Sequence, residues 1–288
     1  MRLKLIAGAV LAAALSGAAS ATIVGAPVDG GLGLQDAVTP VMENIVSFHN
    51  LLLWIITAIC LLVLGLILWI AARYRAKTNP VPRKFSHNTT IEVIWTALPV
   101  LILIVIAVPS FRLLYFQDVI PEADFTIKVA GNQWNWTYEY PDHGGFEFVS
   151  NMLADSEITS EQWQQSRLLS TDVPIVVPSG ATVRVQVTAY DVIHSWAVPA
   201  FGVKMDGIPG RLNETWFLVP EGNEGIYFGQ CSEICGIRHA FMPIEVHVVP
   251  EAVFTAWTEA ANADPYTASN VLASFYASQR ATRVAAAN

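Results

Sequence analysis

Residues 229–242 read GQCSEICGIRHAFM and place two thiols, an imidazole and a thioether within twelve residues. Sulfur and imidazole ligands together select copper or zinc over hard cations. The spacings Cys-x3-Cys, Cys-x3-His and His-x2-Met differ from the Cys-x2-Cys pattern of zinc knuckles. Methionine is a poor zinc ligand, whereas a weak axial methionine accompanies copper held by cysteine and histidine. The segment therefore predicts a copper electron-transfer loop.

The composition excludes an ordinary soluble protein. Of the 288 residues, 53% are hydrophobic and 14% are charged, which is too apolar for a typical globular chain. Residues 120–260 carry 18 acidic and six basic residues, a net charge of −12 against −8 for the whole chain. Nucleic acid is excluded as a partner because it requires a basic surface. An acidic surface can steer a basic protein partner, or it can serve solubility alone.

The N-terminus predicts a signal peptide over residues 1–21. Arg2 and Lys4 precede an apolar run from Leu5 to about Leu15, and small residues follow up to Ala21. The run is too short to span a bilayer, and the Ala-Ser-Ala end is typical of a cleavage site. Export places the loop cysteines in an oxidising compartment, where a disulfide is the alternative to a metal site.

Residues 22–118 predict an N-terminal segment and a transmembrane hairpin. The two apolar runs, at about residues 45–72 and 93–115, are close to or above the roughly 20 residues that a membrane-spanning helix needs. Pro99 and Pro109 lie in the second run, and both can be tolerated in a spanning helix.

The connection between the two runs predicts the orientation. It carries Arg73, Arg75, Lys77, Arg83 and Lys84 with no acidic residue before Glu92. By the positive-inside rule this connection is cytoplasmic. Both termini and everything after about residue 118 then lie on the outer face of the membrane.

Residues 119–257 predict an all-β domain, a sandwich or Greek-key barrel. Short runs of β-branched and aromatic residues recur between turn signals, at 125–129, 134–140, 175–177, 183–189, 196–198, 215–219, 225–229 and 244–249. Residues 258–288, rich in Ala, Ser and Thr, have no clear core pattern. They predict a flexible or processed C-terminal tail.

His194 is the candidate for the ligand that the loop lacks. It lies in YDVIHSWAVP, residues 190–199, which places it 37 residues before Cys231. A histidine beside a tryptophan can also be a hydrogen-bonded packing residue. The incomplete ligand set of the loop favours a metal ligand at this position. The other histidines outside the loop, His49, His87, His143 and His247, have no such context and are interpreted as structural or surface residues.

Four segments carry a family resemblance: QCSEICG at 230–236, DVIHSWAVP at 191–199, GRLN at 210–213 and GNQWNWTYEY at 131–140. Together with His239 and Met242 they resemble subunit II of cytochrome c oxidase, in the form that contains the dinuclear copper centre CuA. The resemblance runs from about residue 40 to 257. It implies a cupredoxin-like Greek-key barrel anchored by a two-helix hairpin in a haem-copper oxidase. The signal peptide and the length suggest a bacterial member.

The resemblance implies a ligand set for CuA: His194, Cys231, Glu233 through its backbone carbonyl, Cys235, His239 and Met242. Both cysteines would bridge two copper ions, each histidine would bind one ion, and the methionine and the carbonyl would be weak ligands. Trp196 and Phe241 would pack the site and keep it rigid. A disulfide between the two cysteines would leave the histidines and the methionine unexplained.

Further roles are implied by the same resemblance. Trp134 would accept electrons from docked cytochrome c, and Glu139 and Asp191 would bind its lysines. The Glu233 side chain would help to bind magnesium at the junction with subunit I. Glu92 would mark the mouth of a proton channel in that subunit. The alternatives are a packing role for Trp134, solvated acidic residues, and a helix capping box at Thr89-x-x-Glu92.

The implied function is that of subunit II of an aa3-type cytochrome c oxidase. It would pass electrons from cytochrome c to the haem of subunit I, where oxygen is reduced to water with proton pumping. The implied partners are subunits I and III, cytochrome c and membrane lipid. The implied location is the bacterial inner membrane, with both termini and the copper domain in the periplasm. A copper-free quinol oxidase subunit is disfavoured by the intact ligands, and a nitrous-oxide-reductase-like domain by the two membrane spans.

Overall fold

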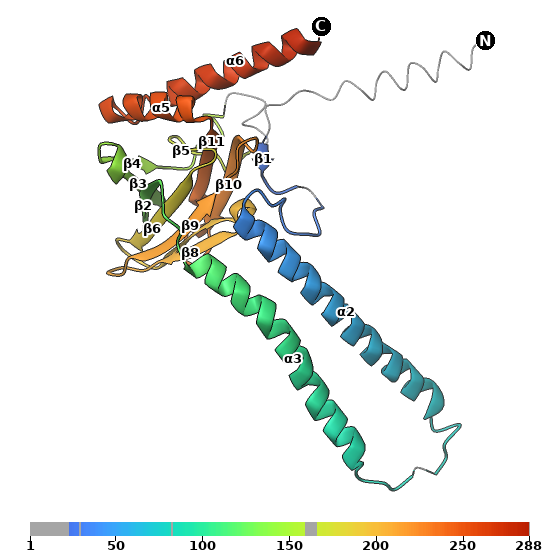
Figure 1. The fold of residues 1–288 in the computed structure, drawn as a ribbon. Helices are drawn as coiled ribbons and strands as arrows, with labels where there is room; N and C mark the ends of the chain where they lie inside the picture. The colour runs from blue at the N-terminus through green and yellow to red at the C-terminus, as the bar shows by residue number, and fades with distance from the viewer. Residues whose placement is uncertain (1–22, 29, 82, 159–165, 288) are drawn as a thin grey trace, which may run out of the picture.

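The computed structural model describes residues 23–28, 30–81, 83–158 and 166–287 (Figure 1). The predicted signal peptide, residues 1–21, lies outside the described residues. Along the chain, a pair of long helices precedes a domain of two β-sheets, and two further helices follow that domain.

The helix pair consists of α2 (Pro40–Arg73) and α3 (Thr89–Asp118). Both are long and apolar enough to cross a membrane, which supports the two predicted spans. Both extend beyond the predicted bounds because polar side chains cap their first turns. Thr39 accepts a hydrogen bond from the Met42 N–H, and Asn88 accepts one from the Ile91 N–H.

The larger sheet has the strand order β5-β11-β10-β7-β8, and β1 pairs with β10. The second sheet has the order β4-β3-β2-β6-β9. The strands are β1 (Ile23–Gly25), β2 (Phe125–Asn132), β3 (Asn135–Tyr140), β4 (Phe146–Ser150), β5 (Ile175–Pro178), β6 (Thr182–Ala189), β7 (His194–Val198), β8 (Val203–Gly207), β9 (Asn213–Leu218), β10 (Gly225–Cys231) and β11 (Pro243–Val249). The helix pair and the two-sheet domain confirm the predicted fold class.

The sequence analysis missed three of these strands, namely β1, β4 and β8. The β8 strand shows little alternation of apolar and polar residues. It lies at the edge of its sheet, where much of its surface is exposed to solvent. The β4 strand lies at the edge of the other sheet, and Gly144 and Gly145 directly precede it. In β4, Phe146 and Phe148 do alternate with Glu147 as in a strand with one buried face, so this strand could have been predicted.

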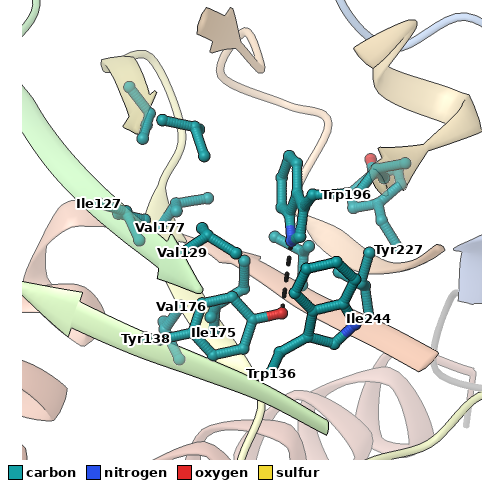
Figure 2. Packing of buried hydrophobic residues seen from close by; sticks show 14 of the residues in the cluster. Ile127, Val129, Trp136, Tyr138, Ile175, Val176, Val177, Trp196, Tyr227 and Ile244 are labelled. Carbon is teal, nitrogen blue, oxygen red and sulfur yellow. Dashed lines mark hydrogen bonds between the residues drawn. The ribbon is translucent and has the colours of Figure 1, made fainter. Parts of the chain in front are cut away.

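The core between the sheets is built from large aromatic residues. Trp136 and Tyr138 of β3 meet Trp196 of β7, and all three are almost fully buried (Figure 2). The Trp196 indole donates a hydrogen bond to the Tyr138 hydroxyl at 3.4 Å. Trp136 donates to the backbone carbonyl of Met242 at 3.1 Å. The core therefore reaches directly to Met242, at the end of the loop that carries the candidate ligands.

The C-terminal region differs from the predicted tail at 258–288. The structure has α5 (Glu251–Ala263) and α6 (Ser269–Ala287), and the predicted domain end at 257 falls inside α5. Phe254, Trp257 and Ala261 are buried at helical spacing. Leu272 of α6 is buried as well. Alanine-rich segments form helices readily, and a few apolar residues at this spacing are sufficient to bury them against the domain.

The helix pair is joined closely to the two-sheet domain. Thr39 donates a hydrogen bond to the Phe201 carbonyl at 2.7 Å, at the short 3-10 helix Pro199–Phe201. A Cβ atom on Gly202 would lie 3.0 Å from the Met42 Cα, so the start of α2 packs against bare backbone. At the end of α3, the Phe116 and Trp216 rings meet edge to face. These contacts fix the position of the two-sheet domain relative to the helices.

Candidate metal centre

Two segments that are distant in the sequence bring the candidate ligands together. His194 begins β7 and Cys231 ends β10, and these antiparallel strands pair at Cys231 and Trp196. The Ser232 N–H donates to the Ser195 carbonyl at 3.0 Å and extends the pairing into the loop. Among the described residues, His194, Cys231 and Cys235 form a buried group whose ligand atoms all lie within 4.8 Å of one another.

The two loop thiols are free. The Cys231 and Cys235 sulfur atoms are 3.8 Å apart, whereas a disulfide bond measures about 2.05 Å. The disulfide alternative is therefore not the arrangement in this structure. Two sulfur atoms at this separation can share metal ions.

The remaining predicted ligands surround the two sulfur atoms. His194 Nδ1 lies 3.8 Å from the Cys231 sulfur, and His239 Nδ1 lies 3.5 Å from the Cys235 sulfur. The Met242 sulfur lies 3.5 Å from Cys235, and the Glu233 carbonyl oxygen lies 3.3 Å from Cys231. The structure thus gathers all the predicted ligand positions. The site consists of thiolate, imidazole and thioether, a donor set that suits copper.

Asp191 holds the His194 ring. Its Oδ1 atom lies 2.9 Å from His194 Nε2, and its two oxygens also accept hydrogen bonds from the backbone N–H groups of Val192 and Gln133. With Nε2 bonded to the carboxylate, the Nδ1 atom faces the sulfur. Burial raises the pKa of Asp191, but the hydrogen bonds from His194, Val192 and Gln133 outweigh it and leave the pKa below its ordinary value.

The two thiols differ in acidity. Burial raises the pKa of Cys231, but contacts with His194 and with backbone groups of Glu233 and Ser195 outweigh it and lower the pKa to about 6. Burial, followed by the nearby Cys231 charge, raises the pKa of Cys235 to about 12. Without metal, the pair therefore holds one thiolate and one thiol. Metal binding would release the second proton.

Trp134 lies against the loop. Its indole N–H donates to the Cys235 carbonyl at 3.3 Å, and the Gln133 side-chain amide donates to the same oxygen at 2.7 Å. Gly236 follows Cys235 with φ +125°, and a Cβ atom there would lie 3.0 Å from the Trp134 ring. Trp134 is thus partly buried at the edge of the core, beside a predicted bridging ligand.

Both parts of the chain match one family. Residues 27–113 match "Cytochrome C oxidase subunit II, transmembrane domain", and residues 125–249 match "Cytochrome C oxidase subunit II, periplasmic domain". "Probable cytochrome c oxidase subunit 2" of Rickettsia bellii (strain RML369-C) is 51% identical over 236 residues, which cover 82% of this chain and 86% of the relative. This chain belongs to the cytochrome c oxidase subunit II family.

A second curated relative agrees with this assignment. "Cytochrome c oxidase subunit 2" of Cereibacter sphaeroides is 47% identical over 268 residues, 88% of each chain. The solved periplasmic domain of subunit II (CoxB) of Bradyrhizobium japonicum is 53% identical, with a TM-score of 0.45, and covers 50% of this chain and 96% of that chain. Subunit II proteins are components of a haem-copper oxidase, which is an oxidoreductase.

Two predicted residues of this subunit II chain lie apart from the metal centre. Glu139 of β3 pairs with Lys128 of β2 at 3.0 Å. Glu92 lies in the first turn of α3, at the end of the helix pair that is remote from the sheets (Figure 1). Its carboxylate accepts a hydrogen bond from the Asn88 N–H at 3.3 Å. The capping residue is Asn88, not Thr89 as the capping-box pattern predicted, because the helix begins at Thr89 itself.

Sequence reasoning assigned no role to two residues of the site. Gln133 contacts both ligand-bearing segments. Gly131 lies so close to His194 that a Cβ atom there would be 2.7 Å from the imidazole ring. Both belong to the GNQWNWTYEY segment. The available signal was that both lie within three residues of Trp134, the predicted electron-accepting tryptophan.

Proposed function

We propose that this subunit accepts single electrons from cytochrome c at a dinuclear copper centre and passes them to the haem of subunit I. Oxygen is reduced to water in that subunit, in an aa3-type oxidase coupled to proton pumping. The observation that carries the proposal is the pairing of each thiol with its own imidazole, Cys231 with His194 and Cys235 with His239. A bound copper pair would supply a one-electron redox couple at this site.

The ligand arrangement supports two ions rather than one. The Glu233 carbonyl lies beside Cys231, and the Met242 thioether lies beside Cys235. Each sulfur therefore has an imidazole and one weak donor nearby. The ligand set proposed for CuA is His194 with the loop residues Cys231, Glu233 (backbone carbonyl), Cys235, His239 and Met242.

The surrounding protein keeps these side chains in place. The buried Trp136 indole holds the Met242 carbonyl, and Asp191 holds the His194 ring. Side chains that are already oriented need to move little when an electron arrives or leaves. A quinol oxidase subunit without copper has no use for such a ligand set, so the alternative is disfavoured.

Trp134 is proposed to receive the electron from cytochrome c. Its indole contacts the Cys235 carbonyl, so one hydrogen bond separates it from a ligand-bearing residue. The acidic residues Glu139 and Asp191 are proposed to bind the lysines of cytochrome c. Lys128 offsets part of the Glu139 charge, and His194 is a neighbour of Asp191.

Magnesium and proton uptake belong to the same proposal. The Glu233 residue is exposed, and its carbonyl faces Cys231. Its side chain is therefore free to bind magnesium together with ligands from subunit I. Glu92 is proposed to mark the mouth of a proton channel in that subunit.

The membrane topology is also proposed. The signal peptide at 1–21 would be removed, the hairpin within 22–118 would lie in the bacterial inner membrane beside subunits I and III and lipid, and both termini and the copper domain would be periplasmic. The side chains along the middle of α2 and α3 are exposed and apolar, as such contacts require.

The test is metal analysis of the full-length chain in the purified oxidase. We expect two copper ions per chain and an EPR spectrum of one electron shared between two copper nuclei. Cys235→Ser should abolish that spectrum, whereas Cys60→Ser, at the exposed Cys60 of α2, should not change it. A wild-type chain that binds zinc alone, or no metal, would refute the proposal.

A further inference from the structure

Gln133 connects the two segments that carry the predicted copper ligands. It lies in the turn between β2 and β3. Its side-chain amide donates to the Cys235 carbonyl at 2.7 Å, and its backbone N–H donates to Asp191 Oδ2 at 2.7 Å. Asp191 in turn holds the His194 ring.

The Cys235 carbonyl receives two donors. The second is the Trp134 indole N–H at 3.3 Å. A carbonyl oxygen has two lone pairs, so both donors can be accommodated and together they restrict its direction. The carbonyl belongs to the peptide between Cys235 and Gly236, and this peptide therefore has one favoured orientation. The indole N–H and the side-chain amide thus donate to the same carbonyl oxygen.

Close packing requires the same arrangement. A Cβ atom on Gly236 would lie 3.0 Å from the Trp134 ring and 3.1 Å from the Gln133 side-chain nitrogen. The loop thus lies against both side chains without an intervening group. If the amide of Gln133 were lost, the carbonyl would keep the weaker of its two donors, and the loop would be free to move away from the indole.

We propose that Gln133 is a positioning residue that holds the Cys235 carbonyl against the Trp134 indole and thereby sets the contact through which electrons reach the copper ligands. This rests on the proposed function, in which Trp134 receives electrons from cytochrome c. Gln133 binds no metal and transfers no electron. Its role is to keep the loop, the indole and the Asp191–His194 segment in one hydrogen-bonded unit.

The first experiment needs neither copper nor activity. Gln133→Met keeps the length of the side chain but cannot donate a hydrogen bond. Hydrogen exchange is measured in the copper-free full-length chain at the His239 and Phe241 amides, which are bonded inside the loop to Gly236 and Arg238. We expect exchange to become faster by up to about tenfold, the effect of losing one such hydrogen bond. Exchange at the wild-type rate would overturn the proposal.

The second experiment uses the purified oxidase. We expect Gln133→Met to retain two copper ions per chain but to show a changed copper hyperfine pattern in its EPR spectrum. It should oxidise cytochrome c about tenfold more slowly, if the contact between the Cys235 carbonyl and the Trp134 indole weakens as much as the hydrogen-exchange rates predict. An unchanged spectrum and an unchanged rate would overturn the proposal. The matched control is Gln186→Met, since Gln186 makes an equally short amide contact, 2.7 Å to Glu214, on the exposed face of β6.

Two further variants separate the outcomes. If Gln133→Met does not accumulate as a folded chain, Gln133→Glu retains the size and polarity but loses the donor. It should raise the exchange rate in the same way, and an unchanged rate would overturn the proposal.

Trp134→Phe should slow cytochrome c oxidation through loss of the indole. If the wild-type oxidase lacks the copper spectrum, the proposed function fails, whereas the exchange result in the copper-free chain still decides the role of Gln133.

Discussion

Asp191 Oδ1 lies 2.9 Å from His194 Nε2, so the carboxylate that the sequence assigns to docking also orients a proposed copper ligand. The imidazole is fully buried and the Asp191 side chain is 34% exposed. One residue thus faces both the solvent and the metal centre. Each of its two roles has its own experimental readout.

Asp191→Asn should affect docking and the copper site together. Loss of the negative charge should weaken cytochrome c binding at low ionic strength, where screening is least. Loss of a carboxylate oxygen beside His194 Nε2 should also alter the copper EPR spectrum. Glu139→Gln is the control, since it removes the same charge from a residue that pairs with Lys128 instead. A spectrum that stays unchanged in Asp191→Asn would contradict the orienting role.

Trp134→Phe should slow the oxidation of cytochrome c and leave the copper spectrum intact. The substitution removes the weaker donor to the Cys235 carbonyl, but the Gln133 amide still holds that oxygen and no proposed ligand is lost. Stopped-flow measurement of cytochrome c oxidation by the purified oxidase provides the check. An unchanged rate would show that electrons arrive by another route.

Gly131→Ala should disturb the candidate metal centre, because Gly131 packs directly against the His194 ring. The new Cβ atom would lie 2.7 Å from the His194 ring, so the buried imidazole must shift. We expect reduced copper content or an altered spectrum in the purified chain. Gly33→Ala is the matched control because a Cβ atom there meets nothing within 4 Å. Full copper content with the wild-type spectrum in Gly131→Ala would argue against the close contact.

The copper-free thiols should react at different pH values. Because the pKa of Cys231 is lowered to about 6, its thiolate should form as the pH rises through about 6 and should be largely present at neutral pH. The raised pKa of Cys235 should keep that residue a thiol up to strongly alkaline pH. Iodoacetamide labelling between pH 5 and pH 9, followed by mass spectrometry, measures both. Equal labelling profiles would contradict the predicted difference.

Tyr276→Phe should destabilise the C-terminal helix α6. The Tyr276 hydroxyl lies 3.0 Å from His247 Nδ1, and His247 in turn lies 2.8 Å from the buried carboxylate of Glu245 on β11. Removal of the hydroxyl should lower the free energy of unfolding by about 1 kcal/mol. Tyr266→Phe, at a residue that is 55% exposed, should cost less. Thermal unfolding of the two variants compares them, and equal midpoints would refute the anchoring role.

The cluster of candidate ligands in the loop and the two long apolar helices could be predicted because their signals are local. Apolar length alone decides whether a helix can cross the bilayer. The residues from Cys231 to Met242 lie close together in the sequence, so their spacing indicates a metal site, and the family resemblance implies the ligand set. His194 was found because the loop lacked a ligand, and the pairing of β7 with β10 places it as expected.

The positioning residues could not be predicted because they act across long separations. Gln133 and Cys235 are 102 residues apart, and Gln133 and Asp191 are 58 residues apart. The C-terminal helices were missed for a similar reason. Leu272 and Tyr276 form no recognisable pattern in an alanine-rich segment. Leu272 is buried only because α6 packs on the domain, and Tyr276 finds its partner, His247, on the distant strand β11.

By itself the sequence determined which groups can bind copper and which segments can enter a membrane, since donor chemistry and hydrophobic length are properties of short stretches. Only the tertiary structure decided which neutral side chains and carboxylates orient those ligands. Such contacts depend on which turn meets which loop after the two sheets have packed around Trp136 and Trp196. Hydrogen bonds are directional and short in range, so they exist only once the packing has brought both partners within reach.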